Sequence, residues 1–171
     1  MIIWLSGPYG VGKSTLAEAM AVKMKDALIF DAEEVGNAVR ENYPDCPYGY
    51  IFEDYSPWSE FCYMLLRDIH ETFHKDILVP MTLVRKESYR IIERLNRDGI
   101  DSRLVVLEAS YQTVHDRILA RGEEEGCCAW RTLNWPERAL RLCRGFIFRR
   151  IISQWMRCAT LFSIKSDTGK R

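Results

Sequence analysis

Short apolar runs alternate with longer segments of helical periodicity along most of this chain. Four apolar runs are typical of buried strands: residues 1–6, 27–30, 77–79 and 103–107. Three segments repeat apolar residues at helical spacing: residues 14–25, 58–75 and 86–98. Gly99 is placed to end one helix and Ser110 to cap the next. The alternation predicts an α/β fold, a central parallel sheet with helices on both faces.

Composition narrows the classes of protein to be considered. The 171 residues, 47% of them hydrophobic and 12% aromatic, are enough for one globular domain with its own core, which excludes a disordered chain. The 24 basic and 24 acidic residues cancel, so we expect no nucleic acid as a partner. No apolar stretch is long enough for a membrane span, and the apolar start is too short for a signal peptide, so we expect a cytoplasmic protein.

A glycine-rich motif follows the first predicted strand. Residues 7–14 read GPYGVGKS, the phosphate-binding pattern G-x-x-x-x-G-K-[ST], with a strand before it and a helix after it. Glycines allow backbone N–H groups to wrap phosphate oxygens, Lys13 places a positive charge on the terminal phosphates, and the Ser14 hydroxyl is a ligand for Mg²⁺. We predict that a nucleotide is held by Gly7, Gly10, Val11, Gly12, Lys13, Ser14 and Thr15.

Asp31 comes directly after the second predicted strand. The carboxyl ends of parallel strands face the ligand crevice, so its carboxylate is a candidate base or orienting group for an acceptor hydroxyl. The alternative is a helix cap for the segment AEEVGNAV, whose Glu33 and Glu34 then complement the helix dipole. Pro80, Met81 and Thr82 follow the third strand at the same rim and either line an acceptor pocket or form a strand-ending turn.

Two arginines lie four residues apart on the helix that begins near Ser110. The guanidinium groups of Arg117 and Arg121 are candidates to reach a transferred phosphate from a mobile lid formed by the Gly- and Glu-rich stretch that follows. The alternative is an exposed helix face that pairs with Asp116 and with the acidic residues 123–125. A long aromatic and acidic loop at residues 43–58 is expected to cover the acceptor.

Four segments together resemble the tunicamycin-resistance protein family, a branch of the P-loop kinase-like nucleotide-binding proteins: MIIWLSGPYGVGKSTLA, FDAEEVGNAVR, SPWSEF and ILVPMTLV. The resemblance runs from residue 1 to about 126. It implies a P-loop kinase-like three-layer fold that binds ATP and Mg²⁺ and gives resistance to a nucleoside antibiotic by binding or phosphorylating it. By position, the glycine loop through Thr15 would hold ATP, Asp31 would lie at the acceptor, and Arg117 and Arg121 would belong to the lid-side helix.

Two classes of function follow. In the first, the protein is a small-molecule kinase whose catalytic residues are Lys13, Asp31, Arg117 and Arg121, with Ser14 as the metal ligand. In the second, the protein binds and sequesters a drug in an ATP-dependent way without phosphoryl transfer. Formation of ADP in proportion to an added acceptor favours the first, whereas tight binding without ADP favours the second.

The last part of the chain has a different composition. Residues 1–126 hold 14 basic and 22 acidic residues, whereas residues 127–171 hold 10 basic and 2 acidic ones. The family resemblance also ends at about residue 126, and in a shifted reading frame Trp155 and Met156 would encode an aspartate. We therefore predict two parts, a nucleotide-binding core at 1–126 and an atypical basic tail at 127–171, and hypothesise that the tail is frame-shifted. Taken as written, its interleaved Arg149, Arg150 and Arg157 indicate peripheral membrane contact or a nucleic-acid patch.

Overall fold

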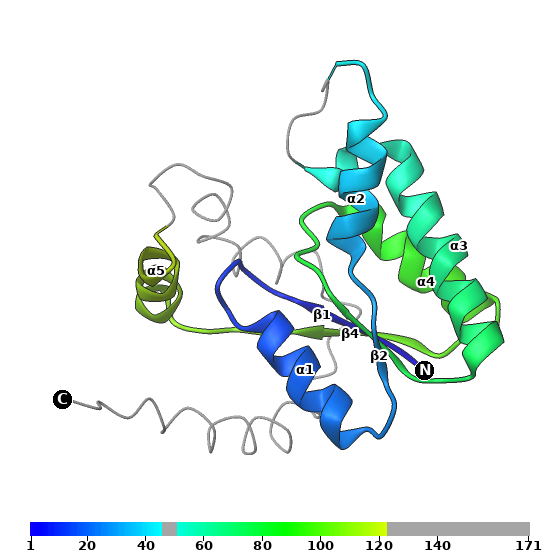
Figure 1. Ribbon diagram of the computed structural model, residues 1–171, viewed down its shortest axis with the longest axis horizontal. Coiled ribbons are helices and arrows are strands. Elements are labelled where there is room, and N and C mark those ends of the chain that lie inside the picture. Colours follow the sequence, from blue (N-terminus) through cyan, green and yellow to red (C-terminus); the bar gives the residue numbers. More distant parts are fainter. Residues whose placement is uncertain (46–50, 123–171) are drawn as a thin grey trace.

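The computed structural model describes residues 1–45 and 51–122, and its central feature is one parallel sheet (Figure 1). The sheet has four strands: β1 (Ile2–Ser6), β2 (Leu28–Ile29), β3 (Ile77–Pro80) and β4 (Ser102–Val106). Their spatial order is β2-β3-β1-β4, with every neighbouring pair parallel. The carboxyl ends of all four strands therefore lie at one edge, as the sequence predicted.

Helices connect and cover these strands. They are α1 (Lys13–Lys23), α2 (Ala32–Glu41), α3 (Ser56–Phe73), α4 (Tyr89–Arg97) and α5 (Tyr111–Ala120), with short 3₁₀ turns at Phe52–Asp54 and Lys86–Ser88. Ser110 caps α5 by accepting a hydrogen bond from the Thr113 N–H at 3.1 Å. The predicted α/β class and the predicted cap are thus confirmed.

Alternate residues of β1 pack in two separate hydrophobic cores, one on each face of the sheet. Ile2 and Trp4 pack in a core with side chains of α3 and α4. Ile3 and Leu5 pack on the opposite face, where α1 contributes Ala17 and Met20. Figure 1 shows α1 on one side of the sheet and α3 and α4 on the other. These buried faces, with helices over both, make the three-layer architecture that the sequence predicted.

Three predicted boundaries differ from the observed ones. The helix expected at 14–25 ends at Lys23, because Lys25 and Asp26 adopt left-handed φ values of 44° and 73°. The helix expected at 86–98 begins with a 3₁₀ turn, and its α-helical part starts at Tyr89. The strand expected at 27–30 is limited to Leu28–Ile29, which pairs only with β3 at the sheet edge.

The loop expected at residues 43–58 is shorter than predicted. It contains the 3₁₀ turn Phe52–Asp54, and α3 already begins at Ser56 because Pro57 is tolerated in the first turn of a helix. Residues 46–50 of this stretch lie outside the described part of the chain.

The predictions for residues 127–171, including the frame-shift and membrane hypotheses, fall outside the described residues. Within residues 1–45 and 51–122, no helix is both long and apolar enough to cross a membrane.

Candidate functional site

The glycine-rich loop lies between the carboxyl end of β1 and the start of α1. Gly7, Gly10 and Gly12 all have positive φ values, of 147°, 77° and 107°. At Gly7 a β-carbon would also lie only 2.6 Å from the Leu107 carbonyl oxygen, so no other residue fits there. The loop consequently brings its backbone close to the ends of β1 and β4.

Lys13 is folded into this loop rather than extended into solvent. Its side-chain amine donates hydrogen bonds to the carbonyls of Gly7 at 3.2 Å and Pro8 at 3.1 Å, and the residue is only 8% exposed. Burial lowers the pKa of Lys13 to about 8, with Arg121 adding to the decrease and Glu33 opposing it. No carboxylate within the described residues forms a salt bridge with Lys13. A bound phosphate would supply the missing negative charge.

The first turn of α1 offers further groups for an anion. Ser14 and Thr15 are exposed there, and the first-turn N–H groups of any helix lack intrahelical acceptors. This turn holds no acidic side chain that would repel phosphate. Among the described residues, no group of three His, Cys, Asp or Glu side chains could hold a metal ion by itself. The Ser14 hydroxyl is thus the protein ligand available to a Mg²⁺ that arrives with a nucleotide.

Thr82 contacts the glycine loop through its hydroxyl group. Its hydroxyl donates a hydrogen bond to the Gly7 carbonyl at 3.0 Å, and the side chain is buried. The next residue, Leu83, donates its N–H to the Ser6 hydroxyl at 3.0 Å. The sequence predicted that residues 80–82 either line an acceptor pocket or form a strand-ending turn. The structure favours the turn for Thr82, because its hydroxyl is buried and bonded to the glycine loop.

Asp31 caps α2. Its Oδ1 accepts hydrogen bonds from the N–H groups of Glu33 at 2.9 Å and Glu34 at 3.4 Å. Both bonds use the same oxygen, and the side chain is exposed at the end of β2. Asp31 therefore caps α2, which is the alternative that the sequence offered. Neither of these two hydrogen bonds uses Oδ2. The start of α2 is fixed in addition by Trp58, whose buried ring N–H donates to the Ala32 carbonyl at 2.9 Å.

The partial burial of Glu33 was not predicted from the sequence. It is half-buried, and burial raises its pKa, with the Asp31 carboxylate adding to the rise and Lys13 opposing it. The charge of Lys13 opposes the rise in the pKa of Glu33, and the charge of Glu33 opposes the decrease in the pKa of Lys13. Its position in the first turn of α2 suggested only a dipole interaction; burial and the approach to Lys13 depend on the packing of α2 and carry no local sequence signal.

Arg117 contacts the glycine loop while its side chain remains exposed. One nitrogen of its guanidinium, Nη1, donates hydrogen bonds to the carbonyls of Val11 at 3.0 Å and Gly10 at 3.4 Å. On the buried side of the same helix, Val114 and Ile118 pack with Tyr9. α5 thus holds the outer turn of the loop in place.

Arg121 lies one turn further along, at the end of α5, where its charge contributes to lowering the pKa of Lys13. Both arginines are exposed, as the alternative stated, but Arg117 binds loop carbonyls. Asp116, the expected partner, bonds instead to Gln112 at 2.7 Å and His115 at 3.3 Å. The predicted lid residues 123–125 lie outside the described part of the chain.

The half-buried Glu53 carboxylate stabilises the segment that follows β3. Both oxygens of Glu53 accept from the Val84 N–H, at 2.8 and 3.1 Å, and one accepts from the Arg85 N–H at 3.0 Å. Asp54 pairs with the Arg85 guanidinium through two contacts of 2.7 Å. Since Thr82 and Leu83 precede this segment and contact the glycine loop, the 3₁₀ turn after α2 is linked to the loop through residues 82–85.

Comparisons with known proteins agree with this fold. Neither a protein-family model nor a curated protein sequence matches the chain. Among solved structures, the chain is similar to the tunicamycin resistance protein of Deinococcus radiodurans, with a TM-score of 0.67 and 20% identity over 92% of this chain and 94% of that one. It is also similar to shikimate kinase from Bacteroides thetaiotaomicron, with a TM-score of 0.53 and 20% identity over 96% and 99% of the two chains.

A third similar structure is the APS kinase of Mycobacterium tuberculosis in complex with AMPPNP and APS, with a TM-score of 0.56 and 15% identity over 95% of this chain and 96% of that one. At these identities the likeness establishes the fold, which is that of the P-loop kinases. The fold implied by the family resemblance is therefore confirmed.

Proposed function

We propose that the protein transfers the terminal phosphoryl group of ATP to a hydroxyl group of a small molecule. The observation that carries this proposal is Lys13, which is buried in the glycine loop without a salt bridge, at the same edge of the sheet as the Asp31 and Glu33 carboxylates that begin α2. A cation for phosphate and a carboxylate for an acceptor hydroxyl thus meet at one edge of the sheet. Phosphoryl transfer needs this kind of positioning more than it needs covalent chemistry by the protein.

The nucleotide would be held by the loop and by the start of α1. Backbone N–H groups of Gly10 and Gly12 and those of the first helical turn would surround the β- and γ-phosphates. The Val11 N–H, which donates to the Pro8 carbonyl at 3.3 Å, would exchange this partner for a phosphate oxygen. Lys13 would exchange its two carbonyl partners for phosphate oxygens. Ser14 would bind the Mg²⁺, which neutralises charge on the phosphates, and Thr15 would add a hydroxyl donor.

In the reaction, the acceptor oxygen forms a bond to the γ-phosphorus while the bond from that phosphorus to the β,γ-bridging oxygen breaks, so that ADP leaves. The hydroxyl proton passes to a carboxylate at the end of β2. Glu33 suits this role because its raised pKa makes it a better proton acceptor than an exposed carboxylate. Asp31, whose Oδ1 caps α2, would orient the hydroxyl through Oδ2. Arg121, near Lys13, would stabilise charge on the transferred group.

A nucleoside antibiotic of the tunicamycin type is our candidate acceptor. The proposal is supported by the four sequence segments that resemble the tunicamycin-resistance family and by the similarity to the Deinococcus radiodurans tunicamycin resistance protein. The acceptor would lie between the carboxylates of the α2 N-terminus and the glycine loop. It would thereby approach the phosphate from the β2 side of the sheet.

Substitutions of Lys13 and of the two carboxylates test the proposal. Lys13→Ala should abolish transfer and weaken nucleotide binding together, since it removes the charge on the phosphates. Glu33→Gln and Asp31→Asn should leave AMPPNP affinity within about threefold of wild type, whereas Glu33→Gln should lower acceptor-dependent ADP release by about 10²- to 10⁴-fold. Wild-type turnover in Glu33→Gln would remove the assigned base. An acceptor that binds tightly with no ADP formed would instead identify a sequestering protein.

A further inference from the structure

The 3₁₀ turn between α2 and α3 contacts α2 through the ring of Phe52. This ring lies on Gly36 of α2 so closely that a β-carbon at Gly36 would be 2.3 Å from the nearest ring atom. The Arg40 guanidinium, one turn further along α2, lies over the same ring, 5.1 Å from its centroid. Only glycine leaves room for this packing, so Phe52 and Gly36 fix how the turn lies against the helix.

The next residue, Glu53, binds the segment that follows β3. One of its carboxylate oxygens accepts a hydrogen bond from the Val84 N–H at 2.8 Å, and the other accepts from the Arg85 N–H at 3.0 Å. Thr82, two residues before Val84, donates its hydroxyl to the Gly7 carbonyl at 3.0 Å. Two consecutive residues thus join α2 to the glycine loop: the first contacts the helix, and the second contacts the segment that holds the loop.

The Gly7 carbonyl is shared by two donors, the Lys13 amine at 3.2 Å and the Thr82 hydroxyl at 3.0 Å. In the proposed function Lys13 exchanges this carbonyl for phosphate oxygens, whereas Thr82 keeps it. Nucleotide binding therefore changes the surroundings of a carbonyl that the segment after β3 also binds. Thr82 is buried and both Glu53 and Phe52 are half-buried, so this series of contacts is largely shielded from water.

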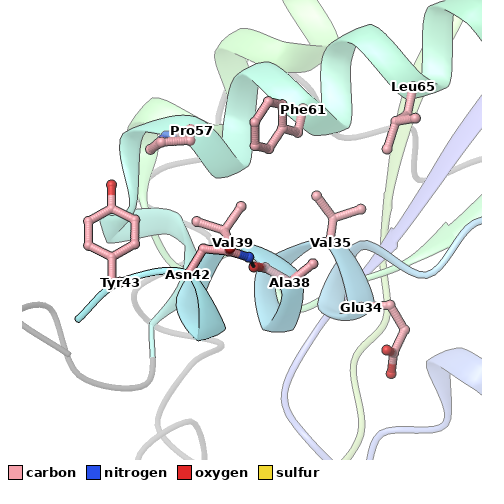
Figure 2. A pocket seen from close by; sticks show the side chains of 9 residues that line it. All are labelled: Glu34, Val35, Ala38, Val39, Asn42, Tyr43, Pro57, Phe61 and Leu65. Carbon is pink, nitrogen blue, oxygen red and sulfur yellow. Dashed lines mark hydrogen bonds between the residues drawn. The ribbon is translucent and has the colours of Figure 1, made fainter. Parts of the chain in front are cut away.

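The position of α2 depends on such contacts because the helix is not closely packed against α3 along one side. Phe61 and Leu65 of α3 face Val35 and Val39 of α2 across a cavity of about 670 Å³ (Figure 2). Helices that pack closely fill such a seam with their own side chains. The contact with Phe52 therefore helps to determine where the first turn of α2 lies.

We propose that Glu53 is a positioning residue, which acts with Phe52 to hold the start of α2 in place relative to the glycine loop, so that nucleotide binding in the loop also orders α2. This inference rests on the proposed phosphoryl transfer, in which Asp31 and Glu33 at the start of α2 act on the acceptor hydroxyl. Glu53 takes no part in proton transfer. An acceptor would meet fixed carboxylates only in the nucleotide-bound protein.

Hydrogen–deuterium exchange of the full-length protein, with and without AMPPNP and Mg²⁺, tests this link. Peptides that cover residues 7–14 report nucleotide binding, and peptides that cover residues 32–39 report the start of α2. In the wild-type protein we expect AMPPNP to slow exchange in both segments, by about threefold or more in α2, because ordering an element makes its local opening rarer. The measurement requires neither an acceptor nor phosphoryl transfer.

Substitutions of Glu53 separate positioning from general stability. Glu53→Ala leaves two N–H groups without their acceptor, so AMPPNP should still protect the loop peptide but should no longer protect α2. Glu53→Gln keeps an oxygen acceptor and should recover most of the response of α2. Glu60→Ala is the control, because it also removes a carboxylate, one that pairs with Arg94 at 2.7 Å on the exposed side of α3. It should respond as the wild type does.

Gly36→Ala breaks the link at its other end without weakening the helix. The added methyl group would overlap the Phe52 ring, whereas alanine is a better helix former than glycine. α2 should therefore remain helical yet lose its response to AMPPNP. This variant keeps the test decisive if Glu53→Ala does not fold. Circular dichroism and thermal melting establish which variants are folded.

Three results would overturn the positioning role: a wild-type protein whose loop is protected while α2 does not respond, a Gly36→Ala protein whose α2 still responds, or equal losses in Glu53→Ala and Glu60→Ala. Each of these leaves the proposed phosphoryl transfer intact, because a protected loop shows that nucleotide is bound. A responsive α2 in a protein that phosphorylates no acceptor would reject the transfer alone. A wild-type loop that AMPPNP does not protect would reject nucleotide binding, and both proposals with it.

Discussion

The Nη1 atom of Arg117 lies 3.0 Å from the carbonyl oxygen of Val11, which joins α5 to a loop more than one hundred residues earlier in the chain. The bond is charge-assisted, since a guanidinium donates to a carbonyl dipole. It holds the Gly10–Val11 turn with both carbonyls toward α5. The arginine predicted to contact phosphate thus also supports the phosphate-binding backbone.

Arg117→Ala should therefore weaken nucleotide binding without removing the loop lysine. We expect a loss of about three- to tenfold in AMPPNP affinity, because the bonds are charge-assisted but the side chain is partly exposed. Calorimetric titration measures this loss. Asp116→Ala, which changes the neighbouring exposed residue on the same helix, is the control and should bind as wild type. Unchanged affinity in Arg117→Ala would show that the loop keeps its shape without the arginine.

Nucleotide affinity should fall at alkaline pH. Burial lowers the pKa of Lys13 to about 8 from the ordinary value of 10.5, so the ligand-free protein loses this charge above about pH 8. Bound phosphate favours the charged form, hence the dissociation constant should rise by up to about tenfold per pH unit above pH 8. Lys13→Ala should bind weakly and show no such break. A wild-type profile that stays flat to pH 9.5 would contradict the lowered pKa.

The charge of Arg121 offers an independent check on this profile. Arg121 helps to lower the pKa of Lys13, so Arg121→Gln should raise that pKa and move the break in affinity to higher pH. The same titrations measure the shift. The contradicting result is an Arg121→Gln protein that binds AMPPNP yet begins to lose affinity at the same pH as the wild type. That result would mean that the two side chains lie too far apart to interact.

The hydroxyl of Thr82 should stabilise the fold through the glycine loop. Thr82→Val removes the donor to the buried Gly7 carbonyl and should lower the free energy of unfolding by about 1 to 2 kcal/mol. Thr82→Ser retains the hydroxyl and should recover the larger part of this loss. Urea unfolding measures the two variants, and a Thr82→Val protein as stable as wild type would show that the hydrogen bond to Gly7 does not stabilise the fold.

Glu53 should respond to pH in the opposite direction from an ordinary exposed carboxylate. Burial raises its pKa, so its stabilising contribution is complete below the unfolded value of about 4.5 and is lost as pH rises through the folded value. Glu53→Gln should therefore be at least as stable as wild type at pH 7. Glu53→Ala, which leaves the N–H groups of Val84 and Arg85 without an acceptor, should lose about 2 to 3 kcal/mol. Thermal melting that ranks Glu53→Gln below Glu53→Ala would contradict this account.

Much of the fold was predictable because its signals are local. The apolar runs, the glycine loop and the Ser110 cap each depend on a few neighbouring residues, and all are found where the sequence indicated. The errors in boundaries also have local causes: the left-handed conformations of Lys25 and Asp26 end α1 early, and Pro57 starts α3 early. Periodicity alone does not register such backbone states.

The site was less predictable because its groups come together through packing. The sequence offered the cap at the start of α2 as an alternative role for Asp31, but it gave no indication that Arg117 binds the loop carbonyls. Glu33 resembled any acidic residue in a first turn, and its burial beside Lys13 follows from the position of α2 against the sheet.

The most direct test of phosphoryl transfer is the mass of the acceptor after incubation with the protein, ATP and Mg²⁺. The screen should include uridine-containing antibiotics and simple nucleosides. Our account predicts that at least one hydroxylated acceptor gains the mass of a single phosphoryl group, with one ADP formed for each product molecule, and that Lys13→Ala forms neither. An acceptor that binds the wild-type protein tightly, yet keeps its mass while ATP remains intact, would contradict it.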